Sequence, residues 1–329
     1  MFKKLLFISI LFLTYISILS LTKHPPLIPA KPALKTIIID PGHGGKDPGA
    51  HGLFSNEAQV SLQVSLLLGK AIQKEFPDVK IVYTRTTDVL PGNAPNKDQG
   101  LRIRANMANE ARGDLFVSVH CNAAGLRPGG WNARRLVGTR PKVVYIGKGK
   151  RRKKKTIREP IYESYYVENK TSGTETFIWA ADRSTAKSTV ISAEETGEDV
   201  EDSLNILDLN SPEARIRAQL YTKFYFRNSY TFAKFVEDEF QKSGRVYRGG
   251  VKQRNNKGIW VLQATGMPSV LIEIGFITNK QEEEYLNSEN GQQEIVGNIM
   301  DALKKYKQEL ESSPKQNTPA ATVSSSATK

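Results

Sequence analysis

The chain has 329 residues, of which 39% are hydrophobic and 25% are charged. This balance is ordinary for a globular protein and is sufficient for one large domain or two small ones with a sizeable core. The formal net charge of +13 indicates an anionic partner. Cys121 is the single cysteine, which excludes an internal disulfide, so stability must come from the hydrophobic core.

The first 22 residues have the pattern of an export signal. Two lysines, Lys3 and Lys4, precede an apolar stretch over residues 5–21 that has no counterpart later in the chain. No A-x-A motif follows, and the stretch is near the lower limit for crossing a bilayer, so a cleaved signal peptide and an N-terminal membrane anchor both remain open. A proline-rich linker is expected over residues 23–34. Because an exported chain meets wall polymers, anionic lipids and envelope proteins, its positive charge does not indicate nucleic acid.

From residue 35 onward, strand-like and helix-like patterns alternate, which predicts an α/β fold. We expect a single domain over residues 35–310, with a central mixed, mostly parallel sheet of about six strands flanked by helices. The predicted strands are residues 35–40, 79–85, 114–120, 175–179, 258–262 and 269–276. The predicted helices are residues 57–76, 98–111 and 212–243, followed by helical segments within 281–310. Asn56 is the expected N-cap of the first helix, and Ser211 can cap the third.

Two segments interrupt the alternation and carry opposite charge. Residues 124–173 form a basic insertion, in which Arg140 to Arg158 hold ten lysines or arginines and no acid. Residues 181–210 are acidic. Insertions of this length are usually functional or mobile. Residues 311–329 are rich in Ser, Thr, Ala and Pro, a composition that predicts a disordered tail.

Three residues with metal-binding side chains occupy corresponding positions in the predicted fold. His43 follows the first strand in a glycine-rich loop, Glu57 opens the next helix, and His120 closes the third strand. The carboxyl ends of parallel strands meet at one edge of a sheet, so these side chains can converge there. Zinc hydrolases typically use three His, Asp or Glu ligands and leave one position open for water. Together the three residues predict a hydrolytic zinc site, although each alone is a weak signal.

Glu273 lies in an otherwise apolar run that reads as a buried strand. A buried carboxylate requires a partner or a function, so a salt bridge to an arginine and a general base beside the metal are both open. Cys121 is next to His120, and successive strand residues point to opposite faces. We therefore expect a structural cysteine that faces the core.

These residues lie in a series of motifs that resembles a known family of enzymes. In chain order the motifs are Asp40-Pro41-Gly42-His43-Gly44-Gly45 with Asp47-Pro48-Gly49, Asn56-Glu57, Thr84-Arg85, Leu101-x-x-Arg104-x-x-x-Ala108-Asn109, and residues 118–123, 173–176 and 268–279. The series is similar to that of the zinc-dependent N-acetylmuramoyl-L-alanine amidases, which cleave bacterial cell-wall peptidoglycan during division. The resemblance extends from about residue 35 to about residue 310 and is interrupted by the basic insertion.

The resemblance implies roles for individual residues. His43, Glu57 and His120 would bind one Zn²⁺, and Glu273 would be the catalytic base. Asn122 and Arg85 would orient substrate or support the loops. The implied reaction is hydrolysis of the amide between N-acetylmuramic acid and L-alanine in the periplasm. A zinc peptidase acting on stem peptides and a non-catalytic wall-binding division scaffold are the alternatives.

Some members of this family carry an inhibitory helix that blocks the zinc until an activator protein displaces it. The acidic segment 181–210 occupies that position, so Glu194 or Glu195 is the expected inhibitory ligand, with a solvated acidic loop as the alternative. The basic insertion has no counterpart in the compact family pattern. We expect its residues 140–158 to bind an anionic envelope polymer or lipid, or to pair with the acidic segment.

Overall fold

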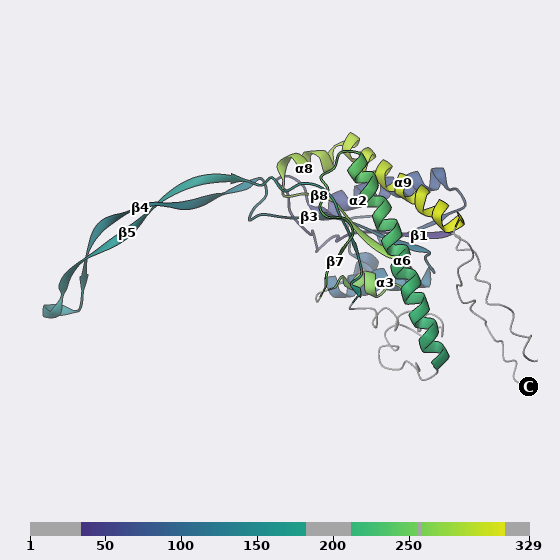
Figure 1. Ribbon diagram of the computed structural model, residues 1–329, viewed down its shortest axis with the longest axis horizontal. Helices are drawn as coiled ribbons and strands as arrows, with labels where there is room; N and C mark the ends of the chain where they lie inside the picture. Colours follow the sequence, from purple (N-terminus) through teal and green to yellow (C-terminus); the bar gives the residue numbers. More distant parts are fainter. Residues whose placement is uncertain (1–33, 182–211, 256–257, 313–329) are drawn as a thin grey trace, which may run out of the picture.

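The structure is a computed structural model that describes residues 34–181, 212–255 and 258–312. Its centre is a six-stranded sheet with the strand order β2-β1-β3-β8-β6-β7 (Figure 1). The pairs β2–β1, β1–β3, β3–β8 and β6–β7 are parallel, and the pair β8–β6 is antiparallel. The expected mixed, mostly parallel sheet of six strands in an α/β domain is confirmed.

The elements follow the predicted alternation closely. The strands are β1 (Thr36–Pro41), β2 (Lys80–Tyr83), β3 (Leu115–Asn122), β4 (Gly130–Ile146), β5 (Lys153–Glu168), β6 (Glu175–Ile178), β7 (Lys252–Gln253) and β8 (Ser269–Phe276). The helices are α2 (Glu57–Glu75), α3 (Lys97–Glu110), α6 (Pro212–Lys242), α7 (Trp260–Gln263), α8 (Lys280–Asn287) and α9 (Glu289–Ser312), with short 3₁₀ turns η1 (Pro91–Asn93) and η2 (Gly149–Arg151). Asn56 caps α2 as expected, because its side chain accepts a hydrogen bond from the Gln59 backbone N–H.

One predicted strand is wrong. The apolar run at residues 258–262 contributes to the short helix α7, and the sixth strand of the sheet is instead β7, Lys252–Gln253. A short apolar run does not distinguish a buried strand from a buried helical turn by its periodicity. Val261 and Leu262 are both buried, so the run covers the sheet without joining it.

The two faces of the sheet have separate hydrophobic cores. Helices α2, α6 and α9 cover one face, where Ile37 and Ile39 of β1 are fully buried. Helices α3 and α7 lie over the other face, against Ile38. This alternation along β1 follows from the opposite directions of successive strand side chains. Cys121 is 2% exposed and belongs to the first core, which confirms that it faces the interior.

The basic insertion forms a long two-stranded antiparallel ribbon, β4–β5, that extends away from the rest of the domain (Figure 1). The sequence analysis predicted no strands in this insertion, because it is rich in charged residues and contains glycines.

Several predicted segments lie outside the described residues. They are the leader 1–22, most of the linker 23–34, nearly all of the acidic segment 181–210, Ser211 and the tail from residue 313. Helix α9 continues to Ser312, two residues beyond the expected end of the domain. None of the helices in the described part of the chain is both long enough and apolar enough to cross a membrane.

Candidate metal and catalytic site

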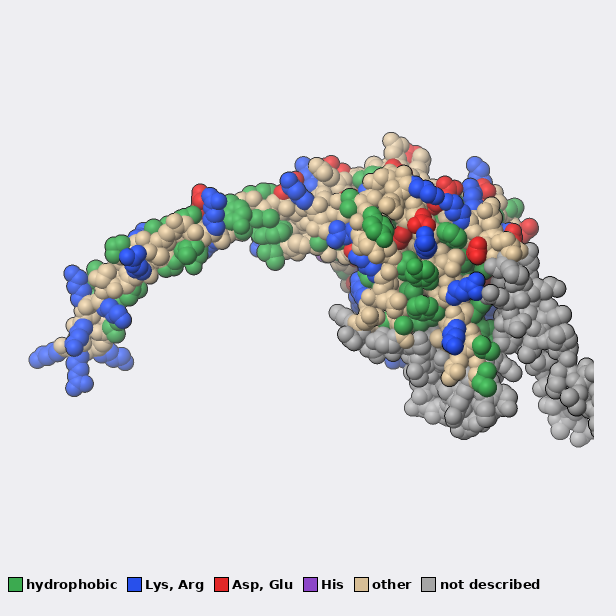
Figure 2. Space-filling model, viewed as in Figure 1, with side chains coloured by type: hydrophobic (Ala, Val, Ile, Leu, Met, Phe, Trp, Pro, Cys, Tyr) green, Lys and Arg blue, Asp and Glu red, His purple; other side chains and the backbone are tan. Residues whose placement is uncertain are grey.

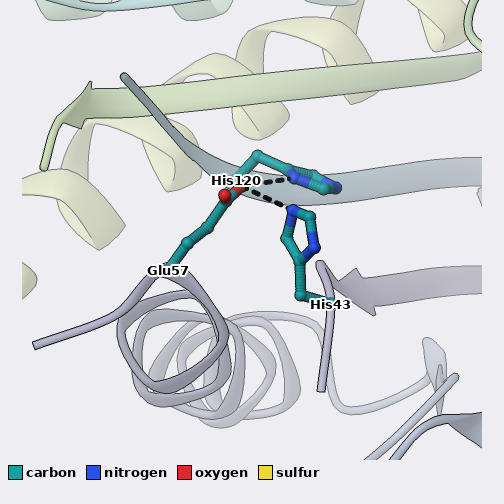
Figure 3. Close-up of side chains that lie close together, drawn as sticks. All are labelled: His43, Glu57 and His120. Carbon is teal, nitrogen blue, oxygen red and sulfur yellow. Dashed lines mark hydrogen bonds and ion pairs between the residues drawn. The ribbon is translucent and has the colours of Figure 1, made fainter. Parts of the chain in front are cut away.

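His43, Glu57 and His120 converge at the carboxyl ends of the central parallel strands (Figure 3). Each offers one ligand atom, and these atoms all lie within 4.8 Å of one another. One oxygen of Glu57, Oε1, lies 3.0 Å from Nε2 of His43 and 2.7 Å from Nδ1 of His120. Two imidazoles and a carboxylate directed at one point form a donor set that suits zinc.

The loop after β1 holds His43 in a conformation that few residues adopt. His43 has a φ of 59°, in the left-handed region that is rare for residues other than glycine. Its Nδ1 lies 2.9 Å from Oδ2 of Asp47, which leaves Nε2 directed at Glu57. Strained backbone of this kind is concentrated at functional sites. A carboxylate on the second imidazole nitrogen is the usual way to orient a histidine ligand.

Two glycines allow the three side chains to approach this loop. A Cβ on Gly42 would lie 2.5 Å from the imidazole ring of His120, and one on Gly49 would lie 2.5 Å from Oε2 of Glu57. Either contact is closer than real Cβ atoms allow. The glycine-rich sequence therefore makes space for the side chains of the site, besides forming the turn.

Glu57 is held in place through both of its oxygens. Oε2 accepts a hydrogen bond from the backbone N–H of Ala50, at 2.9 Å, and Oε1 accepts one from the backbone N–H of Cys121, at 3.2 Å. Burial alone would raise the pKa of Glu57, but hydrogen bonds and charge interactions with His120 and His43 outweigh burial and lower the pKa. The carboxylate therefore stays ionised.

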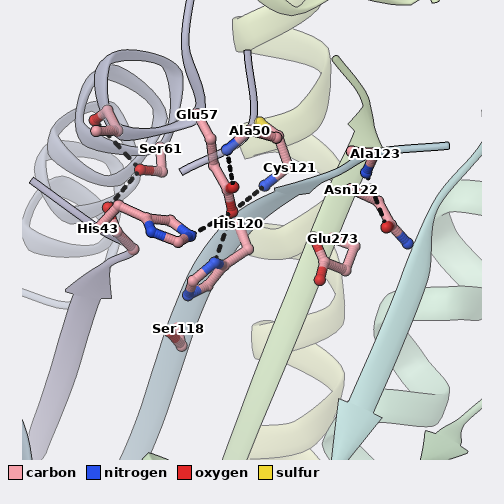
Figure 4. Close-up of polar contacts among 12 residues, drawn as sticks. His43, Ala50, Glu57, Ser61, Ser118, His120, Cys121, Asn122, Ala123 and Glu273 are labelled. Atoms are coloured by element: carbon pink, nitrogen blue, oxygen red, sulfur yellow. Dashed lines mark hydrogen bonds and ion pairs between the residues drawn. The ribbon is translucent and has the colours of Figure 1, made fainter. Parts of the chain in front are cut away.

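Glu273 lies beside this cluster on β8 (Figure 4). It is the register partner of His120 on the adjacent parallel strand, so the two side chains leave the sheet on the same face. Glu273 is 5% exposed, and its Oε2 has no hydrogen-bond partner among the described residues. Burial, followed by the negative charge of Glu57, raises the pKa of Glu273 to about 8. Oε1 lies 3.7 Å from the guanidinium of Arg254, a long ion pair that only partly compensates burial.

Both readings of Glu273 made from the sequence thus have a counterpart in the structure. The partial ion pair to Arg254 corresponds to the salt-bridge reading. The unpartnered Oε2 corresponds to the general base, because an oxygen with no protein partner is left for a water proton. A pKa raised toward neutral is also typical of catalytic carboxylates.

A buried network beneath the site was not predicted from the sequence. Asp40 accepts hydrogen bonds from Thr84 and Ser118 and pairs with Arg104. The guanidinium of Arg104 also donates to the backbone carbonyls of Pro41 and His43. Burial would raise the pKa of Asp40, but Arg104 and the two hydroxyl donors outweigh it and lower the pKa. This network fixes the backbone of the loop that carries His43. In the sequence, the only signal for it was the presence of polar motif residues at these positions.

The structure gives Arg85 supporting contacts with the same loop. Arg85 is 4% exposed, and its guanidinium donates to the carbonyls of Pro41, Gly42, Ala58 and Thr87. Of the two roles expected for Arg85, orienting substrate or supporting the loops, these contacts correspond to support of the loops.

Asn122 lies on the Glu273 side of the site, next to a charged cluster that sequence reasoning missed. Its Nδ2 donates to Oε2 of Glu175, at 2.8 Å. Oε1 of Glu175 pairs with Arg248, at 2.9 Å, and with Lys252, at 2.6 Å. Glu175 is the register partner of Glu273 across β6 and β8, so it lies on the same face of the sheet. The sequence signal that could have indicated this cluster is the high density of basic residues just before and within β7.

A pocket borders the two histidines of the site. Its lining combines the polar residues of the site with apolar side chains and one lysine. The lining residues are Asp40, His43, Asp47, Leu90, Lys97, Leu101, Arg104, His120 and Val261. Both histidines thus line this pocket, whereas Glu273 is not among its lining residues. The predicted inhibitory residues Glu194 and Glu195 lie outside the described residues.

Comparison with known proteins gives related amidases. The family model described as N-acetylmuramoyl-L-alanine amidase matches residues 37–305. The N-acetylmuramoyl-L-alanine amidase AmiC of Escherichia coli O6:H1 strain CFT073 is 27% identical over 276 residues, covering 82% of this chain and 52% of that protein. The germination-specific N-acetylmuramoyl-L-alanine amidase of Bacillus subtilis strain 168 is 23% identical over 276 residues, covering 83% of this chain and 79% of that protein.

Among solved structures, the CwlD amidase of Clostridioides difficile in complex with the GerS lipoprotein is similar in fold. It has a TM-score of 0.50 and 22% sequence identity, over 83% of this chain and 98% of that one. This chain spans about half the length of the AmiC relative that it matches. The family model extends from β1 into α9 and includes His43, Glu57, His120 and Glu273. The chain therefore belongs to the N-acetylmuramoyl-L-alanine amidase family.

Proposed function

We propose that this protein is a zinc-dependent hydrolase that cleaves the amide between N-acetylmuramic acid and L-alanine in peptidoglycan. The observation that carries the proposal is the juxtaposition of three convergent ligand atoms with a buried carboxylate. His43, Glu57 and His120 present these atoms within 4.8 Å of one another, and Glu273 is held on the neighbouring strand. Membership of the amidase family supports the choice of bond.

The residues present fit a zinc ion. Two histidines and one carboxylate supply the three protein ligands of a typical catalytic site. Asp47 orients His43, and the backbone N–H of Ala50 orients Glu57. When bound, zinc would acidify a water molecule and polarise the scissile carbonyl.

Glu273 performs the proton transfers in this proposal. Its unpartnered Oε2 accepts the proton of the attacking water, and the same carboxyl returns that proton to the departing alanine nitrogen. Burial raises the pKa of Glu273, so the carboxyl can both accept and release a proton near neutral pH, while a bound cation would lower the pKa. Asn122 would orient the substrate on this side of the site, next to Glu175.

Digestion of purified peptidoglycan by the zinc-loaded protein, followed by mass spectrometry, tests the proposal. We expect free stem peptides with an unblocked L-alanine amine, together with glycan strands that lack peptide. Products cut within the stem peptide would instead identify a zinc peptidase, and binding without any product would identify a non-catalytic wall-binding scaffold.

The Glu273→Gln variant tests the assignment of the base. It should retain zinc and lose at least about 100-fold in turnover, because general-base catalysis typically contributes a factor of this size. Glu237→Gln is a matched control, since Glu237 is a buried glutamate on α6, in the layer that covers the opposite face of the sheet. Equal turnover in the two variants would remove Glu273 from this role.

We further propose that the acidic segment 181–210 restrains the enzyme. In this scheme Glu194 or Glu195 fills the open zinc position until an activator protein of the division machinery displaces the segment. The complex of CwlD with a lipoprotein is consistent with protein partners for such amidases. Deletion of residues 188–202 should raise basal hydrolysis of the wall; a folded deletion variant with unchanged or lower hydrolysis would contradict the scheme.

The proposed setting is the periplasm, after export directed by residues 1–22, either as a free protein or anchored through that segment. There the enzyme would remodel the wall and separate daughter cells. Residues 140–158 are proposed to bind anionic material of the envelope, because they are rich in cations and free of acids. Fractionation of cells, with sequencing of the mature N-terminus, distinguishes a cleaved leader from an anchor.

A further inference from the structure

The β4–β5 ribbon begins at the edge of the sheet that carries the candidate site. It connects the end of β3, two residues after His120, to the start of β6. Its root is attached to the loop after β8, since Thr278 bonds the backbone N–H groups of Gly129 and Ala124. The ribbon then extends about 50 Å, from a rise of about 3.3 Å per residue, over Gly130–Ile146 and Lys153–Glu168.

The strand register divides the side chains of this ribbon between two different faces. Residues directly opposite each other in an antiparallel pair share a face, and successive residues alternate. The pairs Asn132 with Tyr166, Leu136 with Tyr162, Pro141 with Arg158 and Tyr145 with Lys154 lie on one side. Arg134, opposite Ser164, lies on it too. We call this side, from Asn132 to the tip, the cationic-aromatic face.

The opposite face of the ribbon carries its own counter-charges. There Arg135 pairs with Glu163, while Arg140 and Lys142 both pair with Glu159. Those are the two acids of the ribbon between Asn132 and Tyr166. On that face the cations Arg135, Arg140 and Lys142 are therefore paired with acids. Lys153 and Lys155, nearer the tip, lie on the same face and have no ion pair with the described residues.

The cationic-aromatic face has no such compensation. Arg134, Lys154 and Arg158 are exposed, and no carboxylate of the described residues forms an ion pair with them. Arg158 donates to the neutral hydroxyl of Thr139. Between these cations the face presents aromatic rings, with Tyr162 56% exposed and Tyr166 63% exposed. Figure 2 shows further Lys and Arg side chains gathered at the free end of the ribbon.

The shape of the ribbon favours a flexible linear ligand over a flat surface. The two strands wind around each other along the ribbon (Figure 1), as expected for the strong twist of two-stranded ribbons. The cationic-aromatic face therefore turns as it runs outward, and a planar bilayer could touch only part of it. A polymer can follow the turning face, placing anionic groups on the cations and sugar rings on the tyrosines.

We propose that the cationic-aromatic face binds a peptidoglycan strand through the carboxylates of its stem peptides and its sugar rings. This inference rests on the proposed function, which makes peptidoglycan the substrate. Because the root of the ribbon is attached to the loop after β8, a strand held along it would lead toward Glu273. The ribbon would thus keep the enzyme on one strand while successive stems reach the site.

The test uses two triple variants of the full-length protein that lose the same formal charge. Arg134→Gln, Lys154→Gln and Arg158→Gln remove the unpaired cations of the cationic-aromatic face. Arg135→Gln, Arg140→Gln and Lys142→Gln are the matched control on the opposite face. Both sets are made in the Glu273→Gln background, so that digestion does not disturb binding to purified peptidoglycan sacculi.

The first triple variant should bind sacculi about 10-fold more weakly and with a smaller salt dependence, because three exposed charge contacts each contribute modestly. The control triple variant should bind sacculi with an affinity within about threefold of that of the Glu273→Gln parent. An equal loss of affinity for sacculi in both triple variants would show that only the net charge matters, and it would overturn the proposal. Loss of binding to phosphatidylglycerol vesicles with unchanged binding to sacculi would overturn it in favour of a lipid ligand.

A separate measurement distinguishes failure of this inference from failure of the proposed function. With Glu273 restored, both triple variants should cleave a soluble muramoyl-peptide at the parent rate, and the first should cleave intact sacculi more slowly. Equal rates on sacculi would refute a role for the cationic-aromatic face in catalysis on the polymer. If the parent cleaves neither substrate, the proposed function fails, while the sacculus binding still decides whether the ribbon binds the wall.

Discussion

Glu237 gives a prediction that does not depend on the metal. It lies on α6, is 4% exposed, and accepts a hydrogen bond from the Thr176 hydroxyl at 2.6 Å. Burial raises the pKa of Glu237 to about 7, while the Thr176 hydrogen bond and the charge of Lys252 oppose that rise. The usual pKa of a glutamate is 4.5, so the folded protein binds this proton much more tightly than the unfolded chain does.

The sign and size of the effect follow from proton linkage. A raised carboxyl pKa contributes stability that is present in full below pH 4.5 and is lost as the pH rises through about 7. A shift of about 2.5 pKa units corresponds to about 3 kcal/mol between pH 4.5 and pH 8. Glu237→Gln removes the titrating group and keeps an oxygen that can accept from Thr176. The stability of the variant relative to the wild type should therefore rise by about 2.5 kcal/mol between pH 5 and pH 8.

Urea unfolding at pH 5, 6, 7 and 8 measures this difference directly, because each comparison is made at one pH. Titrating groups that do not interact with Glu237 contribute equally to both proteins and cancel. Glu110→Gln, at an exposed position of α3, is the control for removing one carboxylate from the surface. A stability gap that stays constant from pH 5 to pH 8 would refute the reasoning, since Glu237 would then not titrate in this range.

Two further predictions concern the proposed zinc site. Asp47→Asn should weaken zinc binding about 10- to 100-fold in competition with a chromogenic chelator, because Asp47 orients His43; unchanged affinity would show that the imidazole is held by other contacts. Gly49→Ala should lower the free energy of unfolding by about 1–3 kcal/mol and weaken zinc binding, because its φ of 68° disfavours a side chain and the new Cβ would meet Glu57. Gly138→Ala is the control for Gly49→Ala, because no atom lies within 4 Å of the Cβ that it adds. Equal losses of stability and of zinc affinity in the two variants would contradict this explanation.

The row formed by His120, Glu273 and Glu175 explains how the site has two distinct sides. The three residues are register partners on β3, β8 and β6, so their side chains leave one face of the sheet side by side. His120 joins the convergent ligands, Glu273 stays without a partner on Oε2, and Glu175 is neutralised by Arg248 and Lys252. Neighbouring strands with different surroundings therefore give this row three different environments: a histidine in the candidate metal cluster, a glutamate with one unpartnered oxygen, and a glutamate in ion pairs.

The sequence by itself determined most local elements of the α/β domain and the residue types of the site, but it did not reveal the β4–β5 ribbon or the helix α7. Alternating apolar runs predicted the α/β sheet, and Asn56 marked the start of α2, because these signals depend on side chains close together in the chain. The positions of His43, Glu57 and His120 at element ends were readable for the same reason. The structure brings these three together as the sequence indicated.

Only the tertiary structure decided which distant groups meet and what each environment does to them. Arg104 and Asp40 are 64 residues apart, and only folding places both beneath the His43 loop. The ion pairs of Glu175 and the separation of the two ribbon faces depend on strand register, which alternation within one segment does not specify. The physical reason is that burial, pairing and pKa are properties of the space around a side chain, and that space is assembled from residues far away in sequence.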